Sequence, residues 1–206
     1  MKTRRIARVL LCVLILSLSL IACRTGLEEI ELVGIPTTVY DSTSQEIDMR
    51  VVVEGARRQA QMLLPEAYLR SFVFTGRCQD LPELLGQVKL DFVQVQSGLL
   101  RQRVMIAFVS VDTIQQTLSV RVRDHSAYYP STEHLSMQEV SSFQDVADVA
   151  YEHIEALRGS DCDATMTRLE NSWLVVCTEP GSGVLGPRVC EFEIDASTGQ
   201  IITTEP

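Results

Sequence analysis

The chain has 206 residues, with 18 Lys and Arg against 27 Asp and Glu, and its formal net charge at pH 7 is −9. Because an acidic surface repels phosphate groups, nucleic acid is a poor partner. The three histidines, His125, His134 and His153, make neither an HExxH motif nor a close ligand pair, and no glycine-rich phosphate loop occurs. The sequence therefore predicts neither a metal site nor a cofactor.

The first 22 residues have the features of an export signal. Lys2, Arg4, Arg5 and Arg8 precede an almost wholly apolar run, Val9–Ala22. A charged start, a short apolar core and small residues at its end are typical of a secretory signal peptide. The apolar run is shorter than the roughly 20 residues that a membrane-spanning helix needs. We therefore expect residues 1–22 to be a signal peptide.

The signal ends in Leu20-Ile21-Ala22-Cys23, which resembles the lipobox of bacterial lipoproteins. That resemblance implies acylation of Cys23, with palmitate among the chains, and a lipid-anchored protein on the extracytoplasmic side. Several acyl chains would meet the requirement for stable anchoring. In that family Asp after the cysteine favours the inner membrane. Arg24 here favours the outer membrane if the organism has two. An uncleaved signal anchor and an ordinary cleavage near Ala22 are the alternatives.

Four cysteines remain after the lipid site: Cys78, Cys162, Cys177 and Cys190. An even number in an exported protein predicts two disulfides. The pairing Cys177–Cys190 follows if the strands that carry them form a hairpin, because both cysteines then lie on its buried face. Cys78 would pair with Cys162 and link the two halves of the domain, although four cysteines allow three pairings.

The rest of the chain divides into a tether and two similar units. Residues 23–43 show no sustained helical or strand periodicity of apolar residues, so we expect this segment to be a tether. Residues 44–126 form the first unit, with a helix over 44–64 and strands near 68–74, 88–95, 104–111 and 118–122. Apolar residues change parity after Phe92, which predicts a bulge at that point.

Residues 127–206 form the second unit. A polar loop, His125–Met137, marks the boundary, and its Tyr128 and Tyr129 are candidate partner contacts. The spacing predicts a helix over 142–158 that starts with a capping box of Ser142 and Asp145. Strands follow at 165–170, 173–178, 187–194 and 200–204. Both units give a helix followed by antiparallel strands, so we expect an α+β fold. Duplication of one unit and chance similarity are both open explanations of the shared order.

Three segments of the second unit follow a pattern known from another family. They are the helix Val146–Ala150, the strand Trp173–Val176 and the strand, turn and strand Phe192–Ile201 with its Asp-x-x-Thr-Gly turn. Together they resemble the PepSY family of bacterial extracytoplasmic domains. The resemblance implies a PepSY-like α+β module that is not catalytic and is sometimes linked to peptidase inhibition or envelope regulation.

The sequence supplies no catalytic constellation, so we expect no enzyme. The leading hypothesis is a lipoprotein that binds a protein or peptide at the cell envelope, by adding a strand to a sheet edge. A PepSY-type peptidase regulator, an unrecognised hydrolase and a structural spacer are the alternatives. We expect Trp173 to lie in the core and His153 to be solvated. Gly181-Ser182-Gly183 lacks the GxSxG spacing of a nucleophile elbow and predicts a plain loop.

Overall fold

The computed structural model describes residues 30–32, 47–97, 102–124, 134–136, 139–140, 142–183 and 185–205. The predicted signal, Cys23, Tyr128 and Tyr129 lie outside these ranges. No helix among the described residues is long and apolar enough to cross a membrane. The elements are β1 Ile30–Leu32, α2 Met49–Leu63, β2 Tyr68–Arg77, the 3-10 helix η1 Cys78–Asp80, β3 Gly86–Ser97, β4 Gln102–Asp112, β5 Thr117–Asp124, α4 Phe143–Arg158, β6 Asp163–Arg168, β7 Ser172–Thr178, β8 Arg188–Asp195 and β9 Ile201–Glu205.

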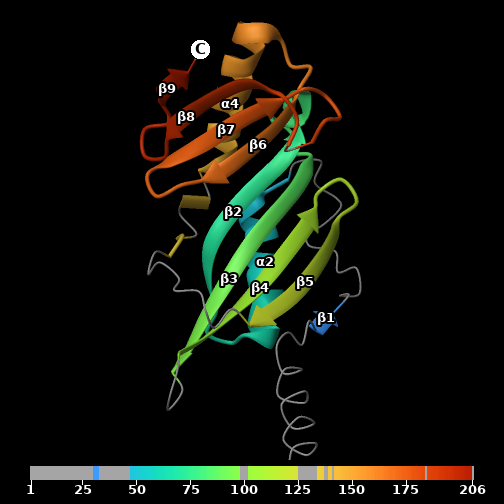
Figure 1. Cartoon of the computed structure of the whole chain (residues 1–206), viewed down its shortest axis with the longest axis vertical. Helices are drawn as coiled ribbons and strands as arrows, with labels where there is room; N and C mark the ends of the chain where they lie inside the picture. The colour runs from blue at the N-terminus through green and yellow to red at the C-terminus, as the bar shows by residue number, and fades with distance from the viewer. Residues whose placement is uncertain are drawn as a thin grey trace, which may run out of the picture.

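The described strands form one nine-stranded antiparallel sheet in the order β1-β5-β4-β3-β2-β6-β7-β8-β9. The predicted α+β class is confirmed. Each helix precedes four strands, and the first strand of each set, β2 and β6, joins the two sets with Phe74 opposite Met166. In Figure 1 helices α2 and α4 lie behind the sheet, and α4 covers the strands from β6 onward. One face of the sheet is therefore covered by the helices.

An aromatic cluster joins the two units into one core. Phe72 and Phe74 of β2 approach Phe143 of α4 with ring centroids 4.8 and 5.5 Å apart. Trp173 of β7 lies 5.3 Å from Phe72 and 4.9 Å from Phe143, and all four side chains are fully buried. Large aromatic side chains contribute much of the energy of a core. The predicted core position of Trp173 is confirmed, and neither unit buries this cluster alone.

Helix α2 begins later than its sequence predicts. Asp48 caps the helix, and its carboxylate accepts the backbone N–H of Arg50 at 2.9 Å. The predicted start at residue 44 is wrong, because a side-chain acceptor that satisfies a free N–H group of the first turn sets the start of a helix. Part of the predicted tether, Ile30–Leu32, forms β1 and pairs with β5.

Helix α4 also has a different N-terminal arrangement. The Ser142 side chain makes no capping hydrogen bond, so the predicted capping box with Asp145 is wrong. A reciprocal pair lies earlier: Glu139 N–H donates to Ser136 Oγ at 3.2 Å, and Ser136 N–H donates to Glu139 Oε2 at 2.6 Å. Leu157 lies in the last turn of α4, and its side chain is exposed.

The predicted bulge in the second strand is wrong. β3 pairs with β4 without a break, and the bulge lies in β2 between Leu69 and Ser71. The change of parity has another cause. Val93 is buried on the face away from the helices, where it forms a second, smaller cluster with Val104 and Ile106. The strand is apolar on both faces at this point.

Candidate ligand pocket on the open face of the sheet

The sheet has a pocket of about 320 Å³ on the face opposite the helices, where the two units meet. We call this face the open face and this hollow the junction pocket. Its volume lies at the low end of the range for small-ligand sites. The junction pocket is lined by Thr75, Gly76, Arg77, Asp80, Leu85, Gly86, Gln87, Asp112, Ile114, Asp163, Thr165, Thr178 and Gly183.

Strand alternation places the polar lining. Side chains of a strand point alternately to the two faces. Because Phe74 is buried against the helices, Thr75 and Arg77 face the other way. Arg77 lies directly opposite Asp163 of β6, and Asp163 lies opposite Thr178 of β7. A row of three polar side chains thus crosses three neighbouring strands.

Two glycines allow the strands at the base of the pocket to approach closely. Gly76 and Gly86 are a cross-strand pair. A Cβ atom on Gly86 would lie 2.3 Å from the carbonyl oxygen of Thr75. The buried Thr113 hydroxyl accepts the Gly86 N–H at 2.8 Å and lies 2.8 Å from the Leu84 carbonyl, to which it can donate. This base is held by backbone contacts and is formed in advance of any ligand.

The lining carries more negative than positive charge. Asp80, Asp112 and Asp163 contribute three negative charges and Arg77 one positive charge, a formal sum of −2. Asp112 Oδ1 accepts two backbone N–H groups of the β4–β5 turn at 3.0 and 2.8 Å. Asp163 Oδ2 accepts the Gly181 N–H at 2.8 Å. These hydrogen bonds hold two of the three carboxylates in place.

Thr178 contributes a hydroxyl to the lining. The residue is 3% exposed, and its side chain lines the junction pocket. Within the ranges that the structure describes, this hydroxyl makes no hydrogen bond. The hydroxyl is therefore an open hydrogen-bonding group at the pocket surface, and a ligand in the pocket can donate a hydrogen bond to it or accept one from it.

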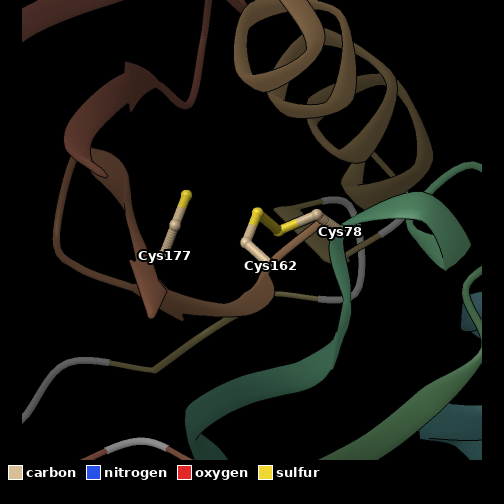
Figure 2. A group of neighbouring side chains, drawn as sticks. All are labelled: Cys78, Cys162 and Cys177. Atoms are coloured by element: carbon tan, nitrogen blue, oxygen red, sulfur yellow. A yellow bond between two sulfur atoms is a disulfide. The ribbon is translucent and has the colours of Figure 1, made fainter. Parts of the chain in front are cut away.

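Two disulfides link neighbouring strands on the core side of the sheet, and both match the predicted pairing. Cys177 lies opposite Cys190 and is bonded to it, and Cys78 is bonded to Cys162 across the β2–β6 junction. The Sγ atoms of Cys78, Cys162 and Cys177 lie within 4.8 Å of one another, and Figure 2 shows the Cys177 sulfur pointing toward the Cys78–Cys162 bond. Metals bind the thiolate form of cysteine, so the sulfurs in this oxidised form act as crosslinks.

The sequence candidates outside the pocket have other surroundings. His153 is half-buried with its ring 4.6 Å from that of Phe192, so the predicted solvated position is wrong. The reason is that α4 packs against β8 on this side as well. His134 is exposed and stacks on Tyr68, with ring centroids 3.7 Å apart. Gly183 of the Gly181–Gly183 loop lines the junction pocket, and the Gly181 N–H donates to Asp163, an arrangement that no local sequence pattern predicts.

Comparisons with known proteins add little to this geometry. No protein-family model matches the chain, and no curated protein matches it. Among solved structures, the chain is similar to a "putative lipoprotein" from Clostridium difficile 630, with 10% identity and a TM-score of 0.45. The match covers 80% of this chain and 99% of that chain. Similarity at this level carries no argument about fold or function, and both rest on the chain's own residues.

Proposed function

We propose that this protein is a lipid-anchored extracytoplasmic lipoprotein that binds a protein or peptide at the cell envelope without catalysing a reaction. The anchor is supported by the charged and apolar segment before Cys23 and by the lipobox-like residues that end it. The observation that carries the binding role is the open face, where the junction pocket lies opposite the helix-covered side.

The open face beside the pocket has a composition suited to a partner. Val73 of β2 faces Thr167 of β6, which faces Leu174 of β7, and all three side chains are half-buried. An apolar centre with hydrogen-bonding groups around it is the usual make-up of a protein interface. A second mode is strand addition at β9, the last strand of the described sheet, since a free edge offers backbone donors and acceptors.

Site-specific photocrosslinking in whole cells tests the binding role. A photoreactive phenylalanine at Leu174 on the open face should give a defined adduct, and the same residue at Leu157 on the exposed end of α4 should not. Absence of any specific adduct from the open face would count against the proposal. An identical adduct from both positions would also count against it.

The anchor is tested by the intact mass of the detergent-extracted protein. We expect the mass of residues 23–206 plus acyl chains, with a gain of four hydrogens when the two disulfides are reduced. An unmodified mass that includes residues 1–22 would refute the lipoprotein proposal. The compartment and every function inferred from it would then have to change.

A PepSY-type peptidase regulator built by duplication is the second candidate, and two matching turns favour it. Asp195 Oδ1 accepts the N–H groups two and three residues later at 2.9 and 2.8 Å, and Gly199 has φ +67°. Asp112 Oδ1 likewise accepts the N–H groups two and three residues later, and Gln116, four residues after Asp112, has φ +56°. Each turn joins the third and fourth strands of its unit. Full-length protein that leaves envelope peptidase activity unchanged would count against this candidate.

A further inference from the structure

The junction pocket has the charge and the hydrogen-bonding groups to hold a cation. We propose that it binds a guanidinium or alkylammonium group, carried by an arginine or lysine side chain of the protein or peptide partner. This inference rests on the proposed function and adds to it the chemistry of the ligand. It comes from two independent observations, the charge of the lining and the hydroxyl of Thr178, a residue that is 3% exposed and whose hydroxyl is unpartnered among the described residues.

The charge of the lining favours a cation. Asp80, Asp112 and Asp163 face one positive group, Arg77. Arg77 Nη2 lies 3.4 Å from Asp161 Oδ1 outside the lining, so part of its charge is compensated there. A hollow lined mainly by one sign of charge concentrates ions of the opposite sign. An anionic ligand would meet three carboxylates.

Thr178 supplies an acceptor next to a carboxylate. Its hydroxyl lines the pocket without a hydrogen bond in the described part of the chain, and it sits directly opposite Asp163 on the neighbouring strand. Residues opposite each other in an antiparallel pair have Cβ atoms about 5 Å apart. A guanidinium has five N–H donors in one plane, and so one group can reach both side chains.

The size of the pocket argues against a bare metal ion as its main occupant. About 320 Å³ is far more space than an ion needs, and one oxygen of Asp112 and one of Asp163 already accept backbone N–H groups. A calcium ion would use the same carboxylates. It is therefore included as a competitor in the test.

The test uses calorimetric titration of the full-length protein in detergent with the tripeptide Ac-Gly-Arg-Gly-NH2. The same peptide with citrulline in place of arginine removes the charge and keeps the shape. We expect the arginine peptide to bind and the citrulline peptide to bind at least tenfold more weakly. Asp163→Asn should weaken the arginine peptide about tenfold, and Thr178→Val several-fold. Glu155→Gln on exposed α4 makes the same change in net charge and should leave Kd unchanged.

Both pocket variants are chosen to keep the fold. An asparagine at 163 can still accept the Gly181 N–H, and valine at 178 has nearly the shape of threonine. Equal Kd values for the arginine and citrulline peptides would overturn the inference, as would a Kd that Asp163→Asn leaves unchanged. Calcium binding at the pocket without peptide binding would also overturn it. Agmatine that binds tenfold more tightly than the peptide would overturn the assignment to a polypeptide side chain.

The failure of this inference can be told apart from the failure of the proposed function. If the arginine peptide does not bind but the adduct at Leu174 persists in Asp163→Asn cells, the partner docks without using the pocket. The inference is then wrong and the proposed function stands. If the peptide binds but no adduct forms at Leu174, the pocket assignment stands and the partner role is wrong.

Discussion

The ion pair between Arg168 and Glu139 should be an important stabilising contact between β6 and the segment before α4. The Arg168 side chain is 4% exposed, and its Nη2 lies 2.8 Å from Glu139 Oε1. The guanidinium also lies 5.6 Å from the ring of Trp173, and Nη1 donates to the Ser172 carbonyl at 3.0 Å. Removal of the Glu139 charge would leave a buried guanidinium without its counter-charge.

The expected cost of Glu139→Gln follows from this geometry. Breaking a fully buried ion pair costs about 3–5 kcal/mol, while an exposed pair contributes about 0–1 kcal/mol. Glu139 is 35% exposed, and a glutamine at this position can still accept one hydrogen bond. We therefore expect a loss of about 2 kcal/mol in the free energy of unfolding. For a chain of this size that loss lowers Tm by roughly 4–8 °C.

The assay is urea unfolding followed by the fluorescence of Trp173, the one tryptophan of the chain. Glu54→Gln is the matched control, because Glu54 pairs with Arg57 and Arg58 on the surface of α2, and it should cost less than about 1 kcal/mol. If Glu139→Gln destabilises the protein no more than the control does, the reasoning about a buried pair is refuted.

The same pair has a predicted pH dependence. Burial alone would raise the pKa of Glu139, but hydrogen bonds from Ser136 and the charge and hydrogen bond of Arg168 outweigh it, and the pKa lies below its usual range. A carboxyl group with a lowered folded-state pKa contributes stability above its unfolded pKa and loses it as the pH falls through the folded pKa. The difference between wild type and Glu139→Gln should therefore shrink below about pH 4.

Three further predictions concern the crosslinks, a turn and the base of the pocket. Replacing both cysteines of a disulfide by alanine should lower the free energy of unfolding by roughly 3 kcal/mol for Cys177–Cys190, which spans 13 residues, and by about 4.5 kcal/mol for Cys78–Cys162, which spans 84. A larger loss for the shorter loop in urea unfolding would contradict the chain-entropy argument. The Ser197 hydroxyl, with N–H groups of the same turn, lowers the pKa of the Asp195 carboxyl to about 2. The ionised carboxylate should therefore stabilise the fold above pH 4, and this stabilisation should be lost as the pH falls toward 2. Carbon NMR of the Asp195 carboxyl should show that Ser197→Ala raises its titration midpoint. Gly86→Ala should destabilise by about 2–3 kcal/mol in the same urea assay, since its Cβ would meet a backbone oxygen at 2.3 Å, and a loss under 0.5 kcal/mol would contradict the close approach.

Local patterns predicted most of the elements because the forces behind them act between near neighbours. Alternation of apolar and polar residues located the strands, and the helical spacing gave the end of α4 at Arg158. The cap of α4 was missed because Ser136 and Glu139 lie several residues before the periodic segment begins. The parity change at Val93 was misread because a strand with two apolar faces looks like a bulged strand in sequence.

The sequence by itself gives the order of most helices and strands, the acidic character and an even set of cysteines that suits two disulfides. The export signal and the lipobox-like residues stay predictions from the sequence. Only the tertiary structure decided that β2 and β6 merge the two units into one sheet with one aromatic core. It also decided the junction pocket, whose lining spans residues 75 to 183. Contacts over such distances depend on strand order and register, and neighbouring residues in the chain carry no local signal of either.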